Sequence, residues 1–119
     1  MIFEEKRRNQ RIDSINLTYF ALDQNGNIIQ DGIGRTLNVS EAGILLETSL
    51  PLDLTQRVLL AIGLEDDLID IRGNVVYSYK HDNGTYKTGI EFYDVDETAC
   101  QILKFFINYF KKQGEKDKN

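Results

Sequence analysis

Apolar residues recur at every second position through most of the chain between residues 15 and 93. This is the period of a β-strand, in which successive side chains point to opposite faces of a sheet. About six strands separated by short turns favour a small barrel or sandwich, because an open sheet of that size would leave exposed edges. The strands that the pattern predicts are 15–22, 35–41, 44–48, 57–64, 68–80 and 85–93.

Alternation also assigns faces within the strands. In the first predicted strand, one face consists of Ile15, Leu17, Tyr19 and Ala21. If the apolar residues of segment 35–41 point into a core, its polar residues point outward. The apolar residues of this segment are Leu37 and Val39, and its outward polar trio is Thr36, Asn38 and Ser40. The apolar face of segment 68–80 is expected to hold Ile69, Ile71, Val75, Tyr77 and Tyr79. Its polar face is expected to hold Asp70, Arg72, Asn74 and Lys80.

Two Asn-Gly pairs, Asn25-Gly26 and Asn83-Gly84, are strong tight-turn signals. They match a type I′ turn, in which both central residues need positive φ.

The last quarter of the chain changes to a helical pattern. Its apolar stripe consists of Val95, Ala99, Ile102, Leu103, Phe106, Tyr109 and Phe110. Asp94 and Glu97 resemble a capping box, and Lys111 and Lys112 suit the negative end of the helix dipole in the last turn. We expect the aromatic stripe to pack on the β-structure, with a partner helix in a dimer as the second possibility. Residues 113–119 are expected to form a disordered tail.

Composition narrows the class of protein. A chain of 119 residues fits one domain. The sequence has no apolar run that could cross a membrane and no signal peptide, so we expect a cytoplasmic protein without membrane insertion. The net charge of −5 argues against binding to long nucleic acid, which requires many cationic contacts with phosphates. A small anionic ligand, in contrast, requires only a local basic patch.

The sequence offers little for catalysis. The only histidine, His81, lies beside an Asn-Gly turn, and the only cysteine, Cys100, lies inside the helical pattern, where we expect it to be a buried small residue. No metal-ligand spacing, nucleophile elbow or phosphate-binding loop is present. We therefore expect a protein that is not an enzyme and that holds no metal or cofactor.

A basic cluster in this acidic chain is the first candidate for binding. Three arginines and a lysine lie between Lys6 and Arg11, and Arg7 and Arg11 form an Arg-x-x-x-Arg pair. Such clusters are commonly solvated surface. Guanidinium groups can also bind phosphate or a guanine edge through two hydrogen bonds and can stack on a base.

The second candidate is Asn38-x-Ser40-x-x-Gly43. Asn38 and Ser40 fall on one strand face, and the glycine permits a tight turn into the next strand. The arrangement could be an ordinary strand end with local turn hydrogen bonds or a small polar platform for a ligand.

The two motifs in this order, with the segments "GRTLNVSEAGILLET" and "GIEF" and a closing helix, resemble the bacterial PilZ domain over nearly the whole chain. The resemblance implies a mainly β fold, a six-stranded antiparallel β-barrel with a C-terminal α-helix, that binds the second messenger cyclic di-GMP. It implies that Arg7 and Arg11 contact guanines and phosphates from a flexible arm, residues 1–14. Asn38, Ser40 and Gly43 would then line the surface of the barrel domain, residues 15–112.

The family accepts Asp or Asn at position 38, and the neutral amide can alter the strength of the guanine contact. Lys6 and Arg8 are possible accessory residues, and Lys6 occupies a position that influences whether one ligand or a stacked pair binds.

The resemblance thus predicts a receptor that acts through an unidentified downstream protein, as a monomer or homodimer, in motility, adhesion, exopolysaccharide or biofilm, or virulence control. Two alternatives remain at this point. One is a PilZ-like protein-interaction module that no longer binds nucleotide. The other is a small β-barrel for single-stranded nucleic acid, which usually needs a basic groove with exposed aromatic residues.

Overall fold

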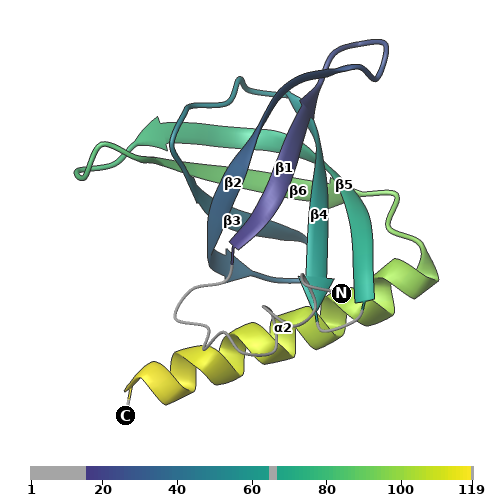
Figure 1. Ribbon diagram of the computed structural model, residues 1–119, viewed down its shortest axis with the longest axis vertical. Coiled ribbons are helices and arrows are strands. Elements are labelled where there is room, and N and C mark those ends of the chain that lie inside the picture. The colour runs from purple at the N-terminus through teal and green to yellow at the C-terminus, as the bar shows by residue number, and fades with distance from the viewer. Residues whose placement is uncertain (1–15, 65–66, 119) are drawn as a thin grey trace, which may run out of the picture.

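The chain folds into a closed six-stranded antiparallel barrel with one long helix across its end (Figure 1). The computed structural model describes residues 16–64 and 67–118. Around the barrel the strand order is β1-β2-β3-β6-β5-β4, and β4 pairs with β1 to close it. The strands are β1 Asn16–Leu22, β2 Ile28–Val39, β3 Gly43–Thr48, β4 Arg57–Leu64, β5 Asp67–Lys80 and β6 Tyr86–Tyr93, and the helix is α2 Glu97–Lys118. The predicted fold class is confirmed.

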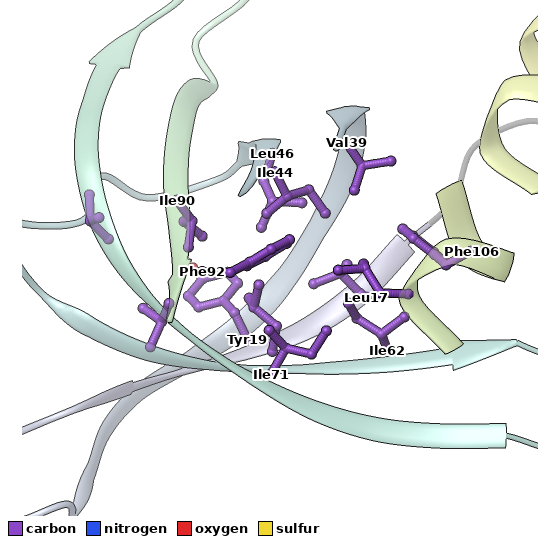
Figure 2. Packing of buried hydrophobic residues seen from close by; sticks show 14 of the residues in the cluster. Leu17, Tyr19, Val39, Ile44, Leu46, Ile62, Ile71, Ile90, Phe92 and Phe106 are labelled. Atoms are coloured by element: carbon purple, nitrogen blue, oxygen red, sulfur yellow. The ribbon is translucent and has the colours of Figure 1, made fainter. Parts of the chain in front are cut away.

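The barrel interior is filled by the inward residues of all six strands (Figure 2). Leu46, Leu60 and Ile62 are fully buried there. Phe106 and Leu103 of α2 belong to the same cluster, so the helix closes one end of the barrel. Removing such side chains from water is the main source of stability for a domain of this size. In the part of the chain that the structure describes, no helix is long and apolar enough to span a membrane.

A β-bulge in β2 decides which side chains of segment 35–41 reach the surface. Thr36 pairs with Leu46 but Asn38 pairs with Leu45, so Leu37 is the extra residue. A bulge inserts one residue without a partner, and the alternation of faces restarts after it. Thr36 is therefore buried, with 3% of its surface exposed, while Asn38 is exposed. The prediction for Asn38 and Ser40 is confirmed, and the prediction that Thr36 shares their outward face is wrong.

A second bulge lies in β5. Val75 pairs with Ile90 and Tyr77 pairs with Gly89, so Val76 is the extra residue. Ile71 and Val75 face the core as expected, but the tyrosines after the bulge do not. Tyr77 is 41% exposed and Tyr79 is 52% exposed, so their assignment to the apolar inner face is wrong.

Both Asn-Gly segments form hairpin turns, but not of the predicted type. Gly26 has a φ of 86° and Gly84 a φ of 88°, whereas neither preceding asparagine has a positive φ. The N–H of Asp23 donates to the carbonyl of Asn27 at 2.8 Å, and that of Gly26 donates to the carbonyl of Asp23 at 3.0 Å. This is a three-residue loop whose last residue is left-handed, and the loop from His81 to Thr85 repeats it.

Helix α2 begins at Glu97 and is capped by Asp96, not by Asp94. The N–H of Ala99 donates to Asp96 Oδ1 at 2.8 Å, which places an acceptor where the first turn has unpaired donors. Asp94 lies before the helix with a φ of 54° and reverses the chain as it leaves β6. The prediction that Asp94 caps the helix is therefore wrong, because the cap is Asp96, two residues later.

We expect Asp96→Ala to lower the free energy of unfolding by about 1 kcal/mol, the usual cost of losing an N-cap side chain. Chemical denaturation monitored by circular dichroism measures this change. Asp94→Asn is the matched control, because asparagine tolerates a left-handed backbone and keeps the reversal. An equal or larger loss from the control would contradict the assignment of the cap.

The helix also extends beyond its predicted end. It continues through Lys118, so residues 113–118 are helical rather than a disordered tail, and Lys111 and Lys112 do not lie in its last turn. Ile107 is buried in addition to the predicted stripe, whereas Ile102 is only partly buried. Cys100 is half-buried, not buried as expected.

Candidate ligand-binding face

The turn between β2 and β3 holds the second predicted motif in a defined geometry. The N–H of Ser40 donates to the carbonyl of Gly43 at 2.9 Å, and the N–H of Ala42 donates to Ser40 Oγ at 3.2 Å. The carbonyl of Ala42 accepts the N–H of Phe92 from β6 at 2.9 Å. The turn is therefore anchored by its own hydrogen bonds and by a neighbouring strand.

Asn38 and Ser40 leave hydrogen-bond donors available at the surface. Asn38 Oδ1 accepts the N–H of Val39 at 2.9 Å, which orients the amide. Among the described residues, Asn38 Nδ2 donates to no protein acceptor, and Ser40 Oγ only accepts, from Ala42. Both residues are exposed, so the amide N–H groups of Asn38 and the hydroxyl of Ser40 can donate hydrogen bonds to an acceptor in solution.

Gly43 has a structural role that does not depend on a ligand. A Cβ atom built at this position would lie 2.4 Å from the carbonyl oxygen of Ile90 on β6. Real Cβ atoms do not approach a backbone oxygen so closely, so only glycine allows the two strands to meet here.

A row of register partners extends the face from Asn38 across three more strands. Asn38 pairs with Leu45, Leu45 with Gly89, and Gly89 with Tyr77. Partners in one row point to the same side of a sheet, so these residues share the outer surface of the barrel. Asn38 therefore stands at one end of a surface whose other members are apolar or aromatic.

The tyrosine at the far end of this row lies flat against the strand beside it. A Cβ atom on Gly89 would lie 2.5 Å from Tyr77 Cε2, so the ring covers the space that the glycine leaves. Tyr77 also stacks on Tyr79, with ring centroids 5.6 Å apart and an angle of 18° between the planes. Sequence reasoning missed these residues, although the consecutive pair Val75-Val76 breaks the alternation and could have indicated the bulge that turns them outward.

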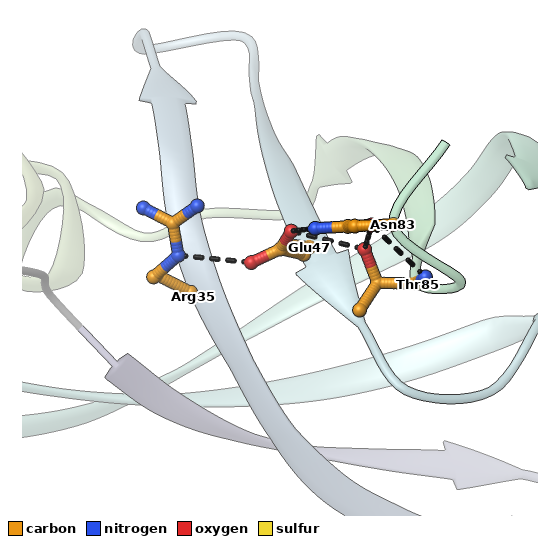
Figure 3. A network of polar contacts seen from close by, with 4 residues as sticks. All are labelled: Arg35, Glu47, Asn83 and Thr85. Carbon is orange, nitrogen blue, oxygen red and sulfur yellow. Dashed lines mark hydrogen bonds and ion pairs between the residues drawn. The ribbon is translucent and has the colours of Figure 1, made fainter. Parts of the chain in front are cut away.

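Beside this row lies a polar network centred on Glu47 (Figure 3). Glu47 Oε1 accepts from Arg35 Nε at 2.9 Å, and Oε2 accepts from Asn83 Nδ2 at 3.1 Å and from Thr85 Oγ1 at 2.9 Å. These groups come from β2, β3 and the β5–β6 hairpin, so the network joins three segments. The hydrogen bonds from Asn83, then Arg35, then Thr85 lower the pKa of Glu47 to about 2.

The depressed pKa predicts acid sensitivity. Because the usual pKa of 4.5 exceeds the folded value of about 2, the contribution of Glu47 is fully present above pH 4.5 and is lost as the pH falls toward 2. We expect Glu47→Gln to be less stable than wild type at neutral pH and to lose less stability across that range. Melting temperatures measured between pH 6 and pH 2 test this, with Glu91→Gln on the exposed surface of β6 as the control. The expectation would be contradicted if the melting temperatures of wild type and Glu47→Gln fell by the same amount between pH 6 and pH 2.

The first predicted motif lies outside the described residues. This applies to Arg7 and Arg11, to the accessory residues Lys6 and Arg8, and to the whole segment 1–14. Of the predicted binding residues, the structure therefore brings together Asn38, Ser40 and Gly43 on one turn.

Comparison with known proteins decides the family. A family model of the PilZ domain matches residues 5–109, which include both predicted motifs. The chain belongs to the PilZ domain family.

Two solved structures are similar in fold to this PilZ domain. The PilZ domain with c-di-GMP of YcgR from Escherichia coli has a TM-score of 0.64 at 12% identity, and the match covers 91% of this chain and 97% of that one. The Bacillus subtilis inhibitor of motility, MotI/DgrA, has a TM-score of 0.58 at 14% identity, with 86% of this chain covered. The match spans about half of MotI/DgrA, 52% of its length. No curated protein matches the chain.

The candidate face of Asn38, Leu45, Gly89 and Tyr77 does not coincide with the hollow found on the barrel. A hollow of about 590 Å³ does exist on the barrel, but it lies between the β1–β2 hairpin and the β3–β4 loop and contains none of the predicted binding residues. Within residues 16–64 and 67–118, no group of histidine, cysteine or acidic residues could hold a metal ion.

Proposed function

We propose that this PilZ domain is a non-catalytic receptor for cyclic di-GMP. The observation that carries the proposal is the outward pair Asn38 and Ser40, fixed on the β2–β3 turn beside a surface of Leu45, Gly89 and Tyr77. The same ligand is bound to the PilZ domain of YcgR. The family match also includes Arg7 and Arg11, which would supply positive charge for the phosphates.

The ligand's chemistry complements both halves of this face. Cyclic di-GMP carries two phosphates and two guanines, so it offers negative charge, acceptor edges and flat aromatic surfaces. Arg7 and Arg11 would bind phosphate oxygens or guanine edges through paired hydrogen bonds and stack on a base. Asn38 Nδ2 and the Ser40 hydroxyl would donate to a guanine that lies on the barrel surface.

The row beyond Asn38 would form the floor under the ligand. Gly89 adds no side chain to this floor, and the ring of Tyr77 lies across it. Measured along the curved wall of the barrel, three strand spacings of about 4.8 Å separate the backbones of Asn38 and Tyr77, roughly 14 Å in all. A guanine held at Asn38 would therefore leave room for a second base on the tyrosine, and stacking on an aromatic side chain contributes about 1–3 kcal/mol per base.

Binding of cyclic di-GMP would transmit a signal by changing the surface that the protein presents to its partner. Residues 1–14 carry the arginines, so ligand bound between them and Asn38 would order this segment against the barrel. A downstream protein would distinguish the two surfaces and so respond to the second messenger. Motility is one process that such a receptor could control.

Isothermal titration calorimetry with cyclic di-GMP tests the proposal. We expect micromolar or tighter binding to wild type and an affinity about tenfold lower for Asn38→Ala, since a hydrogen bond to a charged or polar ligand group contributes about 1–2 kcal/mol. Asn25→Ala is the matched control, because Asn25 lies exposed in the β1–β2 hairpin and should leave the affinity unchanged.

Absence of cyclic di-GMP binding to wild type would refute the proposed receptor function. It would favour the alternative, a PilZ-like interaction module whose partner is captured equally with and without the nucleotide. The titration curve also reports the ratio of ligand to protein, which decides between one ligand and a stacked pair.

A further inference from the structure

Glu91 is a charged residue on the barrel wall directly beside the β2–β3 turn. It lies on β6 and pairs with Gly43, and the N–H of the next residue, Phe92, donates to the carbonyl of Ala42 in the turn at 2.9 Å. Ile90 and Phe92 are buried in the core, so Glu91 between them points outward, where it is exposed. Because β3 and β6 are neighbouring strands, about 4.8 Å apart, Glu91 and the turn face nearly the same side of the barrel.

The carboxylate of Glu91 is not used by the protein's own groups. Among the described residues, no group donates a hydrogen bond to it, and the single ion pair lies elsewhere, between Arg35 and Glu47. A Cβ atom on Gly43 would lie 3.4 Å from Glu91 Cα, so the two backbones approach closely and the glycine contributes no side chain that could cover Glu91. The carboxylate can therefore contact a ligand that lies at the turn.

The motif beside Glu91 offers such a ligand mainly hydrogen-bond donors. Asn38 Oδ1 and Ser40 Oγ each already accept a backbone N–H from a nearby residue, whereas Asn38 Nδ2 and the Ser40 hydroxyl hydrogen are available. These donors suit the O6 and N7 acceptors of guanine. Guanine also carries two donors side by side on its Watson–Crick edge, N1–H and the N2 amino group. A carboxylate has two oxygens that only accept, so it can receive both of them.

We propose that Glu91 selects guanine at this site, with its carboxylate accepting the N1–H and N2–H groups of the base that Asn38 and Ser40 hold. The inference rests on the proposed cyclic di-GMP receptor function and adds the determinant of its base specificity. Two parallel hydrogen bonds to one carboxylate are charge-assisted and geometrically specific. Adenine has an acceptor at N1 and no amino group at C2, so it would leave the carboxylate unpaired, and a site with unpaired polar groups rejects such an analogue strongly.

The negative charge of Glu91 gives opposite expectations for a bystander and for a contact residue. Cyclic di-GMP carries two negative phosphates. A carboxylate that only stood near this ligand would repel it, so neutralising the side chain would strengthen binding. A carboxylate that accepts two hydrogen bonds from the base stabilises the complex by more than this repulsion, so neutralising it weakens binding.

Calorimetric titration of the full chain with cyclic di-GMP and with its inosine analogue, cyclic di-IMP, tests this role. The analogue keeps N1–H and lacks the N2 amino group. We expect wild type to bind the analogue about tenfold more weakly than cyclic di-GMP, because one hydrogen bond to a charged acceptor is lost. Glu91→Gln should bind cyclic di-GMP about tenfold or more weakly than wild type, since its amide presents an N–H to one of the base donors.

The same titrations separate a contact from a structural role. Glu91→Gln should bind the two ligands with affinities within about threefold of each other, because the group that distinguishes them is gone. A residue that merely supported the fold would instead lower the affinity for both ligands alike. Thermal melting by circular dichroism establishes that Glu91→Gln is folded at the temperature of the titration.

Glu41→Gln is the matched control. Glu41 is exposed in the turn itself, so the change removes the same charge near the ligand without altering the wall of β6, and binding should be unchanged or tighter. Three results would overturn the role of Glu91 and leave the receptor intact: undiminished binding by Glu91→Gln, an equal loss in Glu41→Gln, or a wild type that binds both ligands equally. Absence of cyclic di-GMP binding to wild type would refute the receptor itself, so the two failures are distinguishable.

Discussion

Replacing Arg7 or Arg11 with alanine is expected to lower the affinity for cyclic di-GMP by about 100-fold or more. A hydrogen bond to a charged group contributes about 1.5–3 kcal/mol, and a guanidinium can form two of them with a phosphate or a guanine edge. Each tenfold change in affinity corresponds to about 1.4 kcal/mol, so loss of one paired contact accounts for the expected effect. Calorimetry of each variant against wild type measures it.

Two further variants separate a specific contact from general charge. Arg57→Ala removes an arginine whose Nη2 donates to the carbonyls of Asp23 and Gln24 at the β1–β2 hairpin, and it should leave the affinity unchanged. Arg11→Lys keeps the charge but loses the planar pair of donors, so an intermediate affinity is expected. Equal losses in Arg7→Ala, Arg11→Ala and Arg57→Ala would mean that net charge, not the Arg-x-x-x-Arg pair, attracts the ligand.

Gly43→Ala is expected to lower the free energy of unfolding by about 1–3 kcal/mol, the usual cost of forcing extra volume into a packed site. The added Cβ would lie 2.4 Å from the carbonyl oxygen of Ile90, so β3 and β6 must separate at the point where they pair. Urea denaturation measures the loss. For a domain of this size, a loss of 1 kcal/mol corresponds to a melting temperature roughly 4 °C lower.

The matched control is Ser40→Ala in the same turn. It removes only the Oγ acceptor of the Ala42 N–H and leaves the backbone contacts in place, so its effect on stability should be smaller. Equal stability of Gly43→Ala and wild type would show that the strands can adjust. If Gly43→Ala is destabilised as expected, its loss of ligand binding would report strand pairing and not a contact between Gly43 and the ligand.

The strand pattern was largely readable because alternation and burial agree along most of the barrel. Leu17, Tyr19 and Ala21 are buried as the alternation predicts, and the helix stripe supplies Leu103 and Phe106 to the core. The first half of β2, from Ile28, was missed, because its outward isoleucines and its glycines do not show a clear period. The helix cap was misplaced because Asp94 and Asp96 offer the same side chain two residues apart.

The candidate site depended on two features that alternation cannot predict. Asn38 faces outward, as expected, but only because the bulge at Leu37 separates its orientation from that of the buried Thr36. Tyr77 faces outward against expectation because of the bulge at Val76. Each bulge is a property of two paired strands, so neither can be derived from one strand alone.

The barrel class, the family resemblance and the positions of the two motifs could be predicted from the sequence, because each depends on the order of residues along the chain. That Asn38, Leu45, Gly89 and Tyr77 are register neighbours across four strands became visible in the folded barrel alone. The physical reason is register. Residues far apart in the chain become neighbours through hydrogen-bonded pairing, and a single inserted residue reverses every side chain that follows it.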